Sequence, residues 1–183
     1  MIFFSNLVVH QFAYYGPSPK HDTPAGGFCI SVFAVIRRGN KVLLVKPTNR
    51  RKWLTEWSPN IRLMNQERLK KFTKSWLFPG GYVREGEAPE EALKRILKEQ
   101  LGIKSFSAGP GKLYNFYDPS NIFPGNMHWD YCFVFKVKTN EEIRKRPWFS
   151  SIEFVDPRDF GRDDFTSAQG DLALAIGLIG SRK

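Results

Sequence analysis

Three charged residues, Glu87, Arg95 and Glu99, follow Gly81 at defined spacings before Ile103. Gly81 is followed by Glu87 after five intervening residues, and Arg95 follows Glu87 after seven more. Glu99 stands four residues beyond Arg95. Clustered carboxylates can hold a hard divalent cation, which neutralises a phosphate chain and activates an attacking water. Carboxylates in this segment could therefore take part in divalent-cation chemistry.

A glycine loop followed by a helix would position these side chains. Trp76–Phe78 predicts a short strand that leads into a tight loop at Pro79-Gly80-Gly81. Apolar residues at helical spacing predict a helix over Pro89–Leu101, with Gly102 as its C-cap. Residues three and four apart share a helix face, so the side chains at positions 96, 99 and 100 are expected together.

The segment resembles the Nudix box, G-x5-E-x7-R-E-U-x-E-E-x-G-U, in which U is a bulky aliphatic residue. The preceding Trp-x-Phe-Pro-Gly-Gly and the later run from Glu153 to Phe160 are also typical, so the resemblance spans roughly residues 28–160. It implies an α/β (α+β) fold, a Nudix-type α/β/α sandwich with a mixed β-sheet. It also implies a hydrolase of a nucleoside diphosphate linked to another moiety, dependent on Mg²⁺ or Mn²⁺.

Two of the three glutamates that the family places on this helix are replaced. Ile96 cannot ligate a metal, and Gln100 keeps only an uncharged amide oxygen. The resemblance implies a weakened metal site at Glu99 and Gln100, with Glu99, Arg95 and Glu87 as the catalytic group. It also implies an ion pair between Arg95 and Glu87 that holds the loop on the helix. Ile96 either widens the core face or shapes the site.

Other acidic residues near the box, or between two late strands, could replace the lost carboxylates. They are Glu85, Glu90, Glu91, Glu141 and Glu142. Some relatives without the first box glutamate use a histidine base from a late loop. Here residues 138–148 contain no histidine, and His128 is the nearest alternative, in a position where a histidine is more often structural.

A basic insertion at about residues 47–75 precedes the box. From Lys46 to Lys74, nine Lys or Arg residues stand against two Glu, which supplies most of the chain's formal charge of +10. Ser58-Pro59 predicts the start of a helix over about residues 59–72. The predicted substrate-binding residues combine loop glycines, phosphate-binding arginines and base-stacking tryptophans. They are Gly80, Gly81, Arg50, Arg51, Trp53 and Trp57.

The sequence predicts one domain over residues 28–183, which includes the box and the insertion. An N-terminal arm and linker over residues 1–27 are expected to pack on it. Turn signals and β-branched runs predict a hairpin, three later strands and a C-terminal helix. These elements are Phe28–Ile36 with Lys41–Lys46, then Lys112–Tyr117, Trp129–Lys138 and Ile152–Val155, and finally Thr166–Ile179.

The two cysteines, Cys29 and Cys132, lie in apolar runs and are predicted to be buried thiols. Neither has a metal-ligand spacing such as C-x-x-C, which fits a reducing, cytoplasmic location. No apolar run is long enough to span a bilayer, so no membrane association is expected.

Three functions remain open from the sequence. The first is the hydrolase. The second is a catalytically inactive module that binds a nucleotide, a polyphosphate or RNA, because the basic surplus favours anionic partners without choosing among them. The third is a scaffold in which Trp53 and Trp57 anchor an interface, and a homodimer is left open.

Overall fold

The computed structural model describes residues 13–14, 27–57, 64–119 and 125–180. Its centre is one mixed β-sheet built around strand β2 (Phe28–Arg38). β2 runs parallel to β7 (Met127–Lys138), and β7 pairs antiparallel with β6 (Lys112–Pro119) and β5 (Ser107–Ala108). The mixed sheet confirms the fold class that the sequence predicts.

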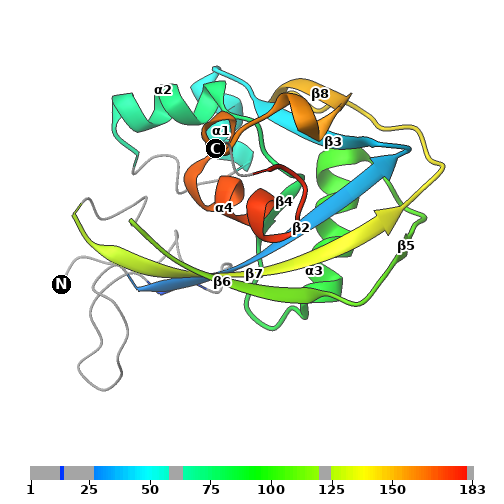
Figure 1. Ribbon diagram of the computed structural model, residues 1–183, viewed down its shortest axis with the longest axis horizontal. Helices are drawn as coiled ribbons and strands as arrows, with labels where there is room; N and C mark the ends of the chain where they lie inside the picture. The colour runs from blue at the N-terminus through cyan, green and yellow to red at the C-terminus, as the bar shows by residue number, and fades with distance from the viewer. Residues whose placement is uncertain (1–12, 15–26, 58–63, 120–124, 181–183) are drawn as a thin grey trace.

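The sheet is covered on both faces. Along β2, Val32 belongs to a core that contains α3 (Pro89–Ile96), whereas Phe33 belongs to a core that contains α4 (Ser167–Ala175). This alternation follows from the two-residue period of a strand, and burial on both faces explains why β2 is nearly continuously apolar. Figure 1 shows the two helices on either side of the strands.

The predicted hairpin is short. β2 and β3 (Lys41–Pro47) pair only at their turn, through Arg37 with Val42 and Arg38 with Lys41, and then diverge. β3 goes on to pair antiparallel with β8 (Phe149–Val155).

The segment before the box lies between the diverging strands. Leu77 exchanges backbone hydrogen bonds with Val45 of β3, and Ala34 N–H of β2 donates to Pro79 O at 2.9 Å. The next three residues form β4 (Gly80–Tyr82), antiparallel to β2. The expected strand over Trp76–Phe78 is therefore reduced to isolated bridges, and the expected tight loop at the glycines is a strand, because β2 offers it a free edge.

The described residues of the basic insertion form two helices. α1 (Arg51–Trp57) was not expected, and α2 (Gln66–Lys74) begins at Asn65, whose side chain accepts from Arg68 N–H at 2.9 Å. Of the helix predicted over residues 59–72, residues 64 and 65 are not helical and Asn65 supplies an N-cap, while the predicted start at residue 59 lies outside the described residues. The predicted cap at Ser58 lies outside the described residues.

The remaining elements are short. The box helix continues as a π-helical turn (Leu97–Leu101), and two 3₁₀ turns (Pro157–Asp159 and Arg162–Asp164) precede α4. β1 (Ala13–Tyr14) pairs with the start of β2. Within the described part of the chain, no helix has both the length and the apolar character needed to cross a membrane.

Candidate functional site

Gly80 lets the box loop lie directly on the sheet. A Cβ atom at this position would stand 2.2 Å from a ring carbon of Phe33 and 2.7 Å from Val32 O. Gly81 has more room, because a Cβ there would meet nothing closer than 3.9 Å. The first glycine is thus required by close packing. The second leaves space beside Ile96 and Gln100.

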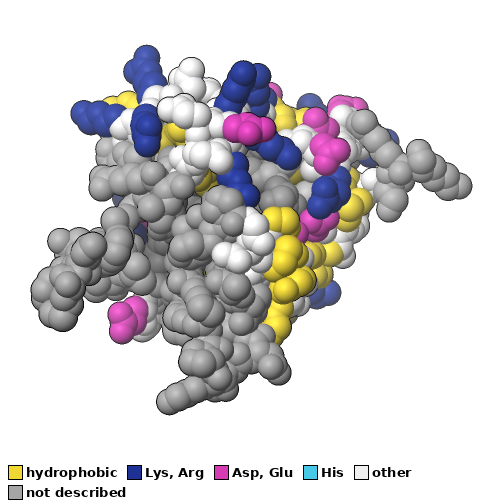
Figure 2. Space-filling model, turned by 90° about the vertical axis from the view of Figure 1, so that its left-hand side faces the viewer, with side chains coloured by type: hydrophobic (Ala, Val, Ile, Leu, Met, Phe, Trp, Pro, Cys, Tyr) yellow, Lys and Arg dark blue, Asp and Glu magenta, His cyan; other side chains and the backbone are white. Residues whose placement is uncertain are grey.

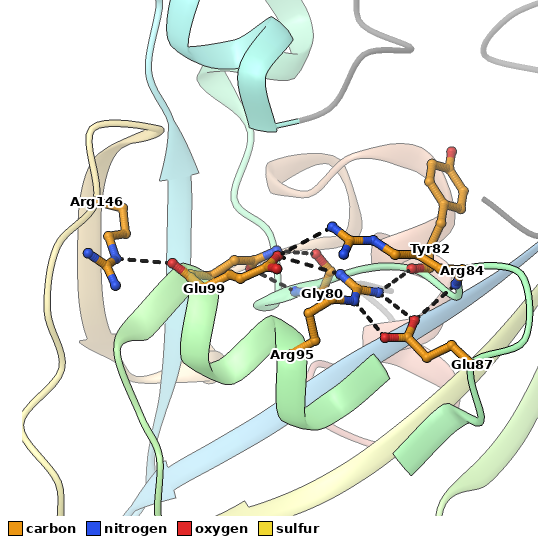
Figure 3. Close-up of polar contacts among 8 residues, drawn as sticks. Gly80, Tyr82, Arg84, Glu87, Arg95, Glu99 and Arg146 are labelled. Atoms are coloured by element: carbon orange, nitrogen blue, oxygen red, sulfur yellow. Dashed lines mark hydrogen bonds and ion pairs between the residues drawn. The ribbon is translucent and has the colours of Figure 1, made fainter. Parts of the chain in front are cut away.

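Glu87 and Arg95 tie the loop to the helix (Figure 3). Arg95 Nε donates to Glu87 Oε1 at 2.6 Å, and a terminal nitrogen donates to Oε2 at 2.7 Å. The same terminal nitrogen reaches Tyr82 O at 2.9 Å, and Arg84 N–H donates to Glu87. The pair forms as the sequence predicts. Its bidentate geometry makes it a strong, directional contact.

The charges of this pair stabilise each other. Partial burial acts to raise the pKa of Glu87, but the bonds from Arg95 and from Arg84 N–H outweigh it, so this pKa lies below its ordinary value. Burial likewise opposes the charge of Arg95, and the contacts with Glu87 and Glu99 outweigh it and raise the Arg95 pKa. Both groups therefore stay ionised at neutral pH.

The three helix positions expected to share a face have separate environments. Ile96 is only 1% exposed and belongs to the core on the α3 side, which favours the structural alternative for it. Gln100 is 4% exposed, whereas the Glu99 side chain is 43% exposed. Glu99 and Gln100 lie in the π-helical turn, which departs from regular α-helical spacing.

Gln100 is bound to the loop backbone. Its Oε1 accepts from Gly80 N–H at 3.2 Å, and its Nε2 donates to Gly80 O at 2.7 Å. Both halves of the amide are used, so the buried peptide group of Gly80 is fully paired. The amide oxygen that was predicted as a weak metal ligand is engaged in this contact, and its metal role stays a prediction.

Glu99 is the exposed carboxylate of the box and lies between cations (Figure 3). Its Oε2 stands 3.7 Å from Arg84 and 3.6 Å from Arg95, while Arg146 Nε donates to Glu99 O at 3.0 Å. Exposed ion pairs of this length contribute about 0–1 kcal/mol. A cation or a substrate can therefore recruit Glu99 at small energetic cost.

The other acidic residues that could replace the lost carboxylates cap a helix, bind a loop or are exposed. Glu91 accepts from Ala88 N–H at 2.9 Å and so caps the box helix, and Glu141 accepts from Lys104 and Ser105 N–H at 2.8 Å each. Glu85, Glu90 and Glu142 are exposed. Among the described residues, no three metal-ligating side chains gather around Glu99. A cation at Glu99 would therefore meet no group of three protein ligands among the described residues, and the substrate or water would supply further oxygen ligands.

The predicted substrate-binding residues of the insertion lie on or beside α1. Arg50 and Arg51 are exposed, and Trp53 is half-buried with Lys52 Nζ 5.3 Å from its ring centroid. Trp57 ends α1, and its side chain lies outside the described part of the structure. Their contact with substrate stays a prediction. Figure 2 shows Lys and Arg side chains gathered at the top of one face, where α2 carries exposed lysines at positions 70, 71 and 74.

Two features of the structure were not predicted from the sequence. Arg84 and Arg146 approach Glu99 from the loop and from the chain before β8. On the opposite face of the sheet, Cys29, His128 and Asp130 are buried and bring their polar atoms within 4.8 Å of one another. The His-x-Asp spacing within a strand was the available signal, since it places both side chains on one face.

Comparison with known proteins agrees with this architecture. Residues 27–174 match the family model described as NUDIX domain. An 8-oxo-dGTP diphosphatase of Haemophilus influenzae is 45% identical over 51 residues, which are 28% of this chain and 38% of that protein. An RNA pyrophosphohydrolase of a Nitratiruptor species is 34% identical over 96 residues, which are 46% of this chain and 61% of that protein. The matches thus span less than two thirds of either relative.

Solved structures share the fold. The MutT protein of Methanosarcina mazei superposes with a TM-score of 0.58 at 16% identity, covering 86% of this chain and 96% of that one. The dihydroneopterin triphosphate pyrophosphohydrolase of E. coli gives 0.54 at 15% identity, covering 81% and 94%. At these identities the likeness concerns the fold alone.

Proposed function

We propose, from the premise that this chain belongs to the NUDIX domain family, that it hydrolyses a nucleoside diphosphate linked to another moiety with the help of Mg²⁺ or Mn²⁺. One observation carries the proposal. The Glu87–Arg95 pair holds the loop after β4 against the helix, Gln100 holds Gly80 of β4, and Glu99 stands exposed beside them. This arrangement supports a role for Glu99 in presenting a carboxylate to a phosphate chain.

A single carboxylate is compatible with this chemistry. Mg²⁺ usually keeps several waters and is held by one or two carboxylates together with the substrate's own phosphates. When bound, such an ion neutralises phosphate charge and generates a better nucleophile from water. In this chain Glu99 would hold the cation, and the exposed Arg84 beside it would attract the phosphates. We expect weak metal affinity without substrate and modest turnover.

The named relatives support the substrate class. One is an 8-oxo-dGTP diphosphatase and the other an RNA pyrophosphohydrolase, and both names describe cleavage of a nucleotide's phosphate chain. We infer a nucleotide or polyphosphate ligand for this chain, with RNA as a further candidate. The exposed basic residues of α2 suit such a ligand.

A second candidate is a binding module without catalysis. The burial of Ile96 and the pairing of both Gln100 amide atoms with Gly80 favour it, because these positions contribute to packing and loop structure in place of metal binding. In this function the loop and the basic insertion would hold a nucleotide or RNA that is not cut. Its affinity would fall steeply with salt.

One experiment separates the two. The full chain, Glu99→Gln and Glu90→Gln are assayed against nucleoside diphosphate derivatives, nucleoside triphosphates and 5′-triphosphate RNA with Mg²⁺ or Mn²⁺. Glu90 is the matched control, because it is an exposed glutamate on the same helix. We expect wild-type turnover, retention in Glu90→Gln, and a loss on the order of 100-fold in Glu99→Gln.

The opposite results are equally informative. If the wild type turns over none of these substrates, or if Glu99→Gln matches it, hydrolysis at this site is excluded. Salt-sensitive binding of RNA or nucleotide by an inert wild type would then establish the binding module. Sedimentation of the same samples tests for a homodimer.

A further inference from the structure

The sheet face opposite the box carries a buried group of metal-ligating side chains. His128 and Asp130 stand two residues apart on β7, so their side chains share a face. β2 runs parallel beside β7 in a register that pairs Cys29 with Asp130. Cys29, His128 and Asp130 are 1%, 4% and 7% exposed. Three donors of different chemistry therefore meet inside the protein.

Their atoms converge on one point. Cys29 Sγ lies 3.6 Å from His128 Nε2, and His128 Nε2 lies 3.2 Å from Asp130 Oδ1. Cys29 Sγ also donates a hydrogen bond to Asp130 Oδ1. In a tetrahedral zinc site, bond lengths of about 2.0–2.3 Å place neighbouring ligand atoms about 3.3–3.8 Å apart. Both distances from the histidine are close to that spacing, whereas the sulfur–carboxylate contact is shorter, so the Asp130 side chain must move away from the sulfur when the ion binds.

A nucleophilic triad does not explain this arrangement. In a triad the nucleophile and the carboxylate contact opposite nitrogens of the imidazole. Here sulfur and carboxylate both approach Nε2, and Nδ1 has no hydrogen-bond partner among the described residues. Burial, with Asp130 adding to it, raises the pKa of the Cys29 thiol, which makes it a poor nucleophile.

A second unpartnered group lies beside the cluster. Asp118 on β6 is directly opposite His128 in the antiparallel register, and the residue is 8% exposed. Within the described structure, Asp118 Oδ2 has no hydrogen-bond partner. Buried polar atoms are almost always paired, so the orphan carboxylate oxygen of Asp118 beside the cluster indicates a missing component.

We propose that Cys29, His128 and Asp130 form a zinc site that joins β2 to β7, with a water next to Asp118 as the fourth ligand. Binding replaces the thiol proton: Cys–SH and Zn²⁺ give Cys–S–Zn and a released H⁺. One thiolate and one carboxylate then balance the charge of Zn²⁺, so the buried site is neutral. The sulfur and nitrogen donors select zinc over Mg²⁺, which takes oxygen ligands. The site is separate from the box chemistry and does not depend on it.

The test uses Co²⁺ as a coloured substitute for zinc in the metal-stripped full chain. A thiolate-to-cobalt charge-transfer band reports sulfur coordination directly, and calorimetry in buffers of different ionisation enthalpy counts released protons. Cys132→Ala is the matched control, because Cys132 is also a buried thiol on this face and lies outside the ligand group. Glu99→Gln controls for binding at the box.

We expect one equivalent of Co²⁺ with the sulfur band, displaced by Zn²⁺, in the wild type and in both controls. Cys29→Ala should lose the band. If that variant fails to fold, Asp130→Asn, which retains the thiol, should weaken Co²⁺ binding by more than about 10-fold. No sulfur band in the wild type, a band that survives in Cys29→Ala, or unchanged affinity in Asp130→Asn would overturn the proposal.

Discussion

Replacing Gln100 with glutamate tests how this box differs from its family pattern. Gln100 is only 4% exposed, and its Nε2 donates a hydrogen bond to Gly80 O at 2.7 Å. An ionised carboxylate cannot donate, so Gly80 O loses its partner and a negative oxygen faces it. Leaving one buried polar atom unpaired costs about 1–3 kcal/mol, and more when a charge is involved. We therefore expect Gln100→Glu to lower the free energy of unfolding by at least about 2 kcal/mol at pH 7.

The pH dependence of this loss has a definite sign. A protonated carboxyl has the shape of the amide and can donate its O–H to Gly80 O, so folding favours the protonated form and raises the pKa of the introduced group. Below its unfolded pKa of about 4.3 the variant should approach wild-type stability. The deficit then grows as pH rises through the folded pKa. Mn²⁺ should reduce the deficit at pH 7, because it supplies the missing positive partner.

Urea unfolding between pH 4 and 8, with and without Mn²⁺, measures both effects. Glu99→Gln is the control, since its exposed side chain should change stability by no more than about 1 kcal/mol. A Gln100→Glu variant as stable as the wild type at pH 7 without metal would refute the reasoning, because the contact with Gly80 would then contribute nothing.

The remaining predictions concern the loop and its supports. Gly80→Ala should destabilise the fold by about 1–3 kcal/mol, because the new Cβ would overlap Phe33 and Val32 O. Gly81→Ala should change stability by no more than about 1 kcal/mol, because a Cβ there has room. Equal melting temperatures for the two variants would contradict this. Ionised Glu87 should contribute its full stabilisation above pH about 4.3 and lose it as pH falls through its lowered pKa. Glu87→Gln should therefore unfold in urea with a smaller loss of stability at acid pH than the wild type. Gln169→Ala should cost about 1 kcal/mol, because Gln169 Oε1 accepts from Phe78 N–H at 2.6 Å, and unchanged thermal unfolding would show that this bond is dispensable.

Local sequence pattern was sufficient for the features that depend on neighbouring residues. The resemblance to the Nudix box implied the pair of Glu87 and Arg95, and the structure confirms it. Apolar periodicity predicted the box helix and most strands, since each face must be buried. The insertion was harder, because the Asn65 cap of α2 was not recognised among its polar residues.

Long-range contacts determined the rest. The sequence shows that a glutamate became Gln100, but the pairing of its amide with Gly80 depends on how the π-helical turn and the β4 strand meet. The sequence likewise does not predict that Cys29 and His128 lie close together, since 99 residues separate them. Their proximity follows from the parallel register of β2 and β7, and a parallel pairing is formed by a crossover that local pattern does not encode. Residue types thus define which chemistry is available, and the strand register decides which residues can perform it together.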